Sequence, residues 1–143
     1  MRWSHWGAIA CTAIASFASD DSSAQAQPCN GGVCKAVVSV TASGGACAVT
    51  GVVPEPLRVT GGPNNIEWDF DDATPGDVRF TDQGITFADP GNQFSEPVIQ
   101  AGGRKFRWHD RNDASPAPFK YTISARIGGV MCTPLDPTIV NQG

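Results

Sequence analysis

The chain has 143 residues, five cysteines, two histidines and a formal net charge of −4, a size that suits one domain with one hydrophobic core. The slight acidic excess gives no support to nucleic-acid binding, which usually shows as a surplus of basic residues, or to a basic helix lying on a membrane. Beyond residue 26, no stretch approaches the roughly 20 apolar residues of a transmembrane helix.

The first 26 residues are predicted to form an export signal. Arg2 supplies a short positive segment, and residues 6–18 form a charge-free, mostly apolar run that is too short to span a membrane. Small residues suited to cleavage follow at Ser16-Phe17-Ala18 and, in the preferred position, at Ala24-Gln25-Ala26.

Cleavage after Ala26 leaves one predicted domain, residues 27–143, with four cysteines. An even number of cysteines is expected for disulfide bonds in an oxidising compartment. We therefore expect a secreted or periplasmic protein. The alternative is a lipoprotein anchored through Cys11, which follows Ala8-Ile9-Ala10.

Residue types beyond position 26 indicate an all-β domain. Twelve Val, six Ile and nine Thr stand against only two Leu, and β-branched side chains fit a pleated sheet better than a helical face. Eleven Pro and fifteen Gly interrupt the same stretch and leave no long window for a helix.

The predicted strands are separated by clusters of Gly, Pro, Asn and Asp. In chain order they are 35–41, 46–53, 57–60, 66–71, 77–81, 84–88, 94–100, 105–109 and 119–127, with the clearest alternation of apolar and polar residues in 66–71, 105–109 and 119–127. Residues 27–32 are expected to form a flexible lead-in and residues 110–118 a loop. About eight or nine short strands predict a two-sheet, antiparallel Greek-key sandwich, with a small barrel as the alternative.

The inward positions of these strands predict the hydrophobic core. They are Val38, Val40, Val49, Ile66, Trp68, Phe70, Phe80, Ile85, Phe87, Phe106, Trp108, Tyr121 and Ile123. Trp68 and Trp108 are also candidates for exposed platforms that stack on a sugar ring, but their alternation with charged neighbours favours burial.

Four cysteines allow three disulfide pairings, and sequence alone does not decide between them. Hairpin geometry favours one of the three. If residues 43–45 turn one strand back on the next, Cys34 and Cys47 lie at opposite ends of the resulting ladder. We therefore favour a local Cys29–Cys34 bond and a Cys47–Cys132 bond across the domain, of which the longer loop should stabilise more.

No metal or other cofactor is expected. The cysteine spacing does not resemble paired zinc knuckles, and one histidine beyond position 26 is too few for a type 1 copper site. Carboxylate oxygens are the ligands that calcium takes, which makes Asp69, Asp71, Asp72 and Asp77 calcium candidates. Their spacing does not fit an EF-hand, and a solvated acidic strand end is the preferred interpretation.

No catalytic residue is predicted. A Ser–His–Asp arrangement would have to use His109, and its alternating neighbours Lys105 and Arg107 disfavour the protonated imidazole that a general base forms. We therefore expect a non-enzymatic exported domain that acts by binding or contributes to envelope structure. The alternative is a small hydrolase or calcium-dependent protein that uses the acidic region 69–77.

Charge is unevenly distributed along the domain. Residues 67–96 contain eight acidic residues against Arg79 alone, whereas residues 104–126 contain six basic residues against two acidic ones. In the preferred interpretation, the acidic row Glu67/Asp69/Asp71 and the basic row Lys105/Arg107/His109 face each other on adjacent strands. In the other, Lys105, Arg107 and His109 form a surface for a charged protein or an envelope polymer.

Several short motifs consist mostly of predicted core positions. They are Ile66-x-Trp68, Gly84-Ile85-x-Phe87, Phe106, Tyr121-x-Ile123 and the ending Leu135-Asp136-Pro137-x-Ile139-Val140-Asn141. In these motifs the chain resembles small, exported bacterial β-sandwich proteins of uncharacterised role, and also plastocyanin-like sandwiches without copper ligands. The resemblance covers about half of the domain. It implies a Greek-key fold and periplasmic or extracellular residence, and it brings no catalytic residue or ligand.

Overall fold

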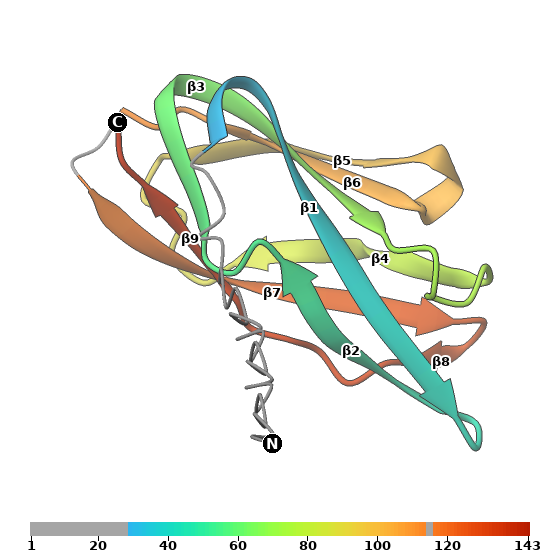
Figure 1. Cartoon of the computed structure of the whole chain (residues 1–143). Coiled ribbons are helices and arrows are strands. Elements are labelled where there is room, and N and C mark those ends of the chain that lie inside the picture. Colours follow the sequence, from blue (N-terminus) through green and yellow to red (C-terminus); the bar gives the residue numbers. More distant parts are fainter. Residues whose placement is uncertain (1–28, 114–115) are drawn as a thin grey trace, which may run out of the picture.

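The computed structural model describes residues 29–113 and 116–143, which contain nine strands and one short 3-10 helix. The predicted export signal and the alternative anchor at Cys11 lie outside the described residues. Within the described ranges, no helix is long and apolar enough to cross a membrane. The elements shown in Figure 1 are β1 (Cys29–Ser43), β2 (Ala46–Val53), β3 (Leu57–Phe70), β4 (Val78–Phe87), β5 (Phe94–Gln100), η1 (Ala101–Gly103), β6 (Lys105–Asp110), β7 (Ala117–Ile127), β8 (Val130–Met131) and β9 (Thr138–Asn141).

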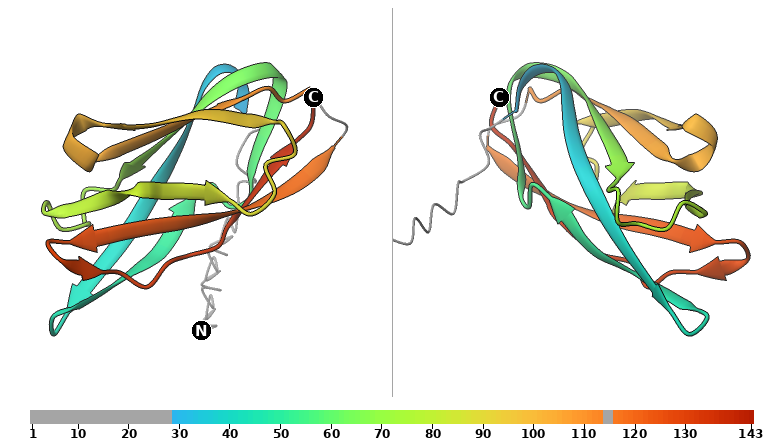
Figure 2. Two further views of the ribbon diagram at one scale, coloured as in Figure 1. Left: turned by 180° about the vertical axis from the view of Figure 1, so that it is seen from behind. Right: turned by 45° about the vertical axis from the view of Figure 1, so that its right-hand side comes forward.

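The prediction of an all-β domain is confirmed, and the strands face one another in two layers. One layer has the order β2-β1-β3-β6-β5, the other contains β4, β7 and β8, and β9 pairs with both β3 and β7. Seen from behind in Figure 2, β4 and β7 lie in front of β1 and β2. Aromatic rings meet between the layers, for example Trp68 of β3 with Tyr121 of β7 and Phe80 of β4 with Phe106 of β6.

The expectation of a wholly antiparallel fold is wrong, because β3 pairs in parallel with β1 and with β9. The segment after β8 also bonds to two strands at once. Leu135 O accepts from Ile123 N of β7 at 2.8 Å, and Thr133 N donates to Cys47 O of β2 at 2.9 Å. Hydrogen bonds therefore run from β2 through β1, β3, β9 and β7 and back to β2, and they do not divide the strands into two separate antiparallel sheets.

Strand β3 is longer than expected, because the predicted turn at residues 61–65 is a bend within it. Gly61 and Gly62 have φ values of +78° and +81°, a backbone conformation that glycine adopts without a steric penalty. Before this bend β3 pairs with β9, and after it β3 pairs with β6. The bend therefore lets β3 exchange β9 for β6 as its neighbour while the strand continues.

Strand β1 follows β3 through the same bend. Its register with β3 shifts between Asn30 and Gly32, and Gly31 and Gly32 also have positive φ values. From Cys29 onward, the residues expected as a flexible lead-in are therefore paired strand. The expectation was wrong because glycines that usually mark a loop here allow two strands to curve together.

The core matches the predicted inward positions closely. Ten of the thirteen predicted side chains are buried, and Phe70, Phe87 and Trp108 are half-buried against them. Trp68 is fully buried, and its Nε1 donates to the Tyr121 hydroxyl at 3.3 Å. This side chain is therefore a core residue and not a platform for a sugar.

Candidate functional site

The outward side of β3 and β6 collects charged residues that the sequence singles out, and β1 adds Lys35, which was not predicted to belong with them. We call Lys35, Glu67, Asp69, Lys105, Arg107 and His109 the charged face. Successive side chains of a strand point to opposite sides, so these residues alternate with the buried core positions. Three rows cross the strands in register: Lys35–Glu67–Arg107, Val37–Asp69–Lys105 and Val33–Asn65–His109.

The acidic and basic rows face each other in part, because Glu67 lies opposite Arg107 and Asp69 opposite Lys105. The third member of each row does not follow the preferred interpretation: Asp71 bonds to Ser39 and Thr74, and His109 lies opposite Asn65. Lys105 Nζ lies 3.5 Å from Glu67 Oε2 and 3.6 Å from Asp69 Oδ1. These side chains are partly buried, and ion pairs near the surface contribute about 1 kcal/mol or less each. Lys35 and Arg107 differ from Lys105, because in the described part of the chain neither of them takes part in an ion pair.

His109 lies at the end of the charged face. Its Nδ1 is 3.3 Å from Asn65 Oδ1, a contact between two side chains of adjacent strands. This amide, and not a serine or a carboxylate, is the side-chain partner of the ring. The contact gives the histidine no part of a Ser–His–Asp arrangement.

The four calcium candidates are not brought together. Asp69 faces Lys105, whereas Asp71 accepts hydrogen bonds from the Ser39 hydroxyl and from Thr74 N and Oγ1. These bonds hold the pKa of the Asp71 carboxyl below its usual range. Asp72 and Asp77 are exposed. Residues 29–113 and 116–143 contain no group of three or more His, Cys, Asp or Glu side chains that could hold a metal ion.

Saturating calcium is expected to leave the melting temperature of the domain unchanged. Asp69 and Asp71 are already engaged by protein partners, and a site that retains few carboxylates binds calcium weakly. Thermal unfolding with calcium or with magnesium chloride at equal ionic strength would measure this. A calcium-specific rise in the melting temperature that Asp72→Asn or Asp77→Asn abolishes would contradict it.

Three surface pockets, of about 370, 280 and 380 Å³, each have one carboxylate in their lining. These are Asp77, Asp82 and Asp136. Glycoside hydrolysis requires two carboxyl groups that face each other across a cleft. None of the three pockets offers such a pair.

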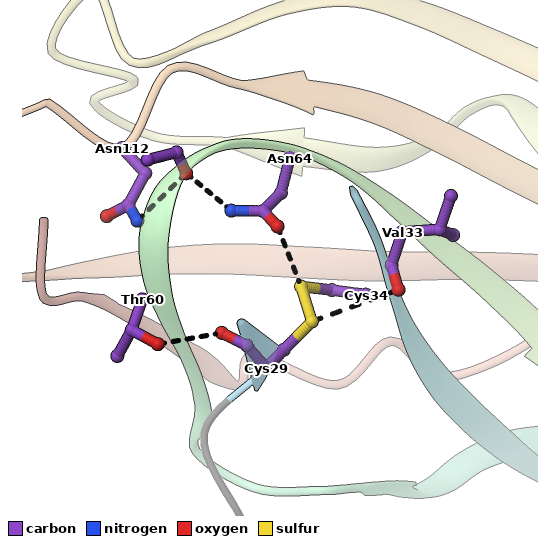
Figure 3. Close-up of a disulfide and its surroundings, with 7 residues drawn as sticks. Cys29, Val33, Cys34, Thr60, Asn64 and Asn112 are labelled. Carbon is purple, nitrogen blue, oxygen red and sulfur yellow. Dashed lines mark hydrogen bonds between the residues drawn. A yellow bond between two sulfur atoms is a disulfide. The ribbon is translucent and has the colours of Figure 1, made fainter. Parts of the chain in front are cut away.

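The structure contains the disulfides Cys29–Cys34 and Cys47–Cys132, the pairing that hairpin geometry favours. The second bond joins β2 to the segment after β8, across 85 residues of sequence. The first closes the bend of β1 (Figure 3), where Cys34 Sγ lies 3.6 Å from Asn64 Oδ1.

A set of buried polar side chains beside this bend was not predicted from the sequence. Asn64, Asp110, Asn112 and Asn141, which we call the corner cluster, are each at most 2% exposed. Asn64 Nδ2 and Asn112 Nδ2 both donate to Gly62 O, at 2.5 and 3.1 Å (Figure 3). The two amides thereby hold the bend of β3 against the end of β6.

The sequence carried one signal for the corner cluster. Asp and Asn side chains often bond to the main chain two residues further on, and Asp110-Arg111-Asn112 has that spacing. Asn112 N donates to Asp110 Oδ1 at 3.0 Å. This turn lies at the start of the segment expected as a loop, which gave no sign that it is buried.

No protein-family model matches the chain, and no curated protein matches it in sequence. Two arrangements stand out in the described residues: the charged face on β1, β3 and β6, and the corner cluster where β3 bends.

Proposed function

We propose that this protein is an exported, non-enzymatic domain that binds an anionic partner through its charged face. The partner would carry carboxylate or phosphate groups, as an acidic protein or an anionic envelope polymer does. Secretion or residence in the periplasm is supported by the composition of residues 1–26 and by the two disulfides.

The observation that carries this proposal is the placement of Lys35 and Arg107. They flank Glu67 in one row across three strands, so their main chains are about 10 Å apart. Lys105 is ion-paired with Glu67 and Asp69, whereas Lys35 and Arg107 form no ion pair within the described residues and would be available to another molecule. The guanidinium fork of Arg107 suits a carboxylate or a phosphate.

Apolar side chains beside Lys35 add contact area. Val33 and Val37 precede and follow it on the outward side of β1 and are 48% and 40% exposed, and Val53 of β2 lies next to Val37. An interface gains affinity from apolar contact and partner selectivity from charge. Binding through this face should weaken as ionic strength rises, because exposed charges are screened by salt.

Reversing the two free charges is expected to weaken binding about tenfold or more, since each lost charge contact contributes on the order of 1 kcal/mol. The double variant Lys35→Glu/Arg107→Glu would be titrated against fluorescently labelled polyglutamate and labelled polygalacturonate at low salt. Fluorescence anisotropy gives the dissociation constant for each probe, and the probe that binds distinguishes an acidic polypeptide from an acidic polysaccharide.

The matched control is Lys120→Glu/Arg126→Glu, which makes the same change in net charge on exposed positions of β7. We expect this variant to bind like the unmodified protein. Equal losses in both variants would reduce the effect to net charge and contradict a specific face. Failure of the unmodified protein to bind either probe would overturn the proposed anionic partner.

A further inference from the structure

Two buried oxygen atoms of the corner cluster have no hydrogen-bond partner among the residues that the structure describes. Asp110 Oδ1 accepts from Asn112 N at 3.0 Å and from Asn141 Nδ2 at 2.8 Å. Asp110 Oδ2 and Asn141 Oδ1, in contrast, are unpartnered, although both residues are fully buried. Buried acceptors without a donor are costly and rare in folded proteins.

We propose that Asp110 is held in its protonated form and that its Oδ2 donates the proton to Asn141 Oδ1. A carboxylic acid that faces a primary amide can form two parallel hydrogen bonds, one in each direction. The bond from the amide nitrogen to Asp110 Oδ1 is already present. A single bound proton forms the second bond, and this bond gives both Asp110 Oδ2 and Asn141 Oδ1 a hydrogen-bond partner.

The surroundings of Asp110 favour the neutral acid. Its register partners are Asn64 on β3 and Phe94 on β5, and those of Asn141 are Val59 on β3 and Ala117 on β7. None of these side chains is charged. The side chains of the surrounding elements thus provide hydrogen bonding or apolar packing and no cation in direct contact with the carboxyl group.

Two charged groups act on Asp110 from nearby in the sequence. His109 favours the carboxylate, whereas Asp113 opposes it, and Asp113 is itself paired with Arg111 at 2.6 Å. Burial has the larger effect and raises the pKa of the Asp110 carboxyl above its ordinary value, against the bonds from Asn141 and Asn112. This shift agrees with the acid form that the two unpartnered oxygen atoms require.

The shared proton would make the junction of β6 and β9 sensitive to pH. The pKa of Asp110 is higher in the folded chain than its ordinary value of 3.8. The stability that the proton contributes is therefore complete below that ordinary value and is lost as the pH rises through the folded value. Between the two values, this one group raises the equilibrium constant for unfolding about tenfold per pH unit.

Asp110→Asn removes the titratable proton but keeps the side chain's ability to form both hydrogen bonds. Asparagine keeps one acceptor and places an N–H where the acid has its O–H, so both bonds to Asn141 can form at any pH. We expect the unfolding equilibrium constant of the unmodified protein to rise with pH above about pH 4, and that of the variant to lack this rise. Asp82→Asn, at an exposed position of β4, is the control and should keep it.

A second measurement does not depend on how well the variant folds. In the unmodified protein, the side-chain carboxyl carbon of Asp110 can be followed by NMR as the pH changes. We expect the chemical shift to change from that of the protonated acid to that of the carboxylate at a pH above the ordinary range of an aspartate. A change within or below that ordinary range would overturn the proposal, as would a pH dependence of unfolding that Asp110→Asn leaves unchanged.

The alternative to a shared proton is a bound cation that the two unpartnered oxygen atoms coordinate. Sodium, potassium or calcium would then raise the melting temperature of the unmodified protein but not that of Asp110→Asn. That result would replace the proton with a metal ion. Equal insensitivity of both proteins to these ions, together with a protonated Asp110, supports the shared proton.

Discussion

Replacing Cys47 and Cys132 together with alanine is expected to lower the free energy of unfolding by about 4.5 kcal/mol, from the entropy of closing a long loop. The bond joins positions 85 residues apart. It ties β2 to the segment after β8, and that segment is also hydrogen-bonded to both β2 and β7. Urea denaturation of the double variant and of the unmodified protein gives the difference.

The other disulfide provides the control. Cys29 and Cys34 are only five residues apart, so the same entropy argument gives a loss of about 2 kcal/mol for Cys29→Ala/Cys34→Ala. The cross-domain bond should therefore matter about twice as much. An equal or larger loss from the local bond would show that packing at the bend, and not loop closure, governs the contribution of these disulfides.

Trp68→Ala is expected to lower the free energy of unfolding by about 3–5 kcal/mol, the range for truncating a large buried aromatic residue. Trp68 is fully buried, and its ring centroid lies 5.5 Å from that of Tyr121. Its Nε1 also donates to the Tyr121 hydroxyl at 3.3 Å. The truncation therefore opens a cavity between the layers and removes a donor from a buried hydroxyl group.

Trp108→Ala is the comparison for this change. Trp108 is half-buried, and its Nε1 donates to Ile85 O at 2.9 Å, so a smaller loss is expected. Trp68→Phe should fall between the two, because it keeps most of the ring volume but not the hydrogen bond. Chemical denaturation of all three variants tests the order. A greater loss for Trp108→Ala than for Trp68→Ala would contradict the position assigned to Trp68.

Alternation of apolar and polar residues was sufficient to predict most strands and the side of each strand that is buried. Segments such as 66–71 and 119–127 have one polar side and one apolar side, and this alternation depends only on the pleat of a strand. Strand pairing could not be predicted in the same way. A strand has the same alternation whether its neighbour runs parallel or antiparallel, so the partners of β3 were not visible in its sequence.

The bend of β3 was hidden for a different reason. Gly61-Gly62-Pro63 has the composition of a turn, and only the neighbouring strands reveal that the chain stays paired on both sides of it. β9 pairs with the part of β3 before the bend, and β6 pairs with the part after it. These contacts are long-range, and no local pattern reports them.

The charged face and the corner cluster also differ in how far they could be predicted from the sequence. Most of the charged face could be predicted, since Glu67 and Asp69 alternate with core residues on one strand and Lys105 and Arg107 do so on another. Lys35 could not, because it joins the face only through the pairing of β1 with β3. The corner cluster could not, because Asn and Asp are usually exposed. Their burial depends on donors and acceptors from residues 62, 110 and 141, which meet only after the strands have assembled.

The central claim, an exported domain cross-linked by two disulfides, is tested most directly by an intact-mass measurement. The full-length chain would be expressed in a bacterial host and recovered from its periplasm or culture medium. We expect a chain that begins at Gln27 and gains four hydrogen atoms on reduction, one for each cysteine of the two disulfides. A chain that retains residues 1–26, carries lipid on Cys11, or shows no mass change on reduction would contradict it.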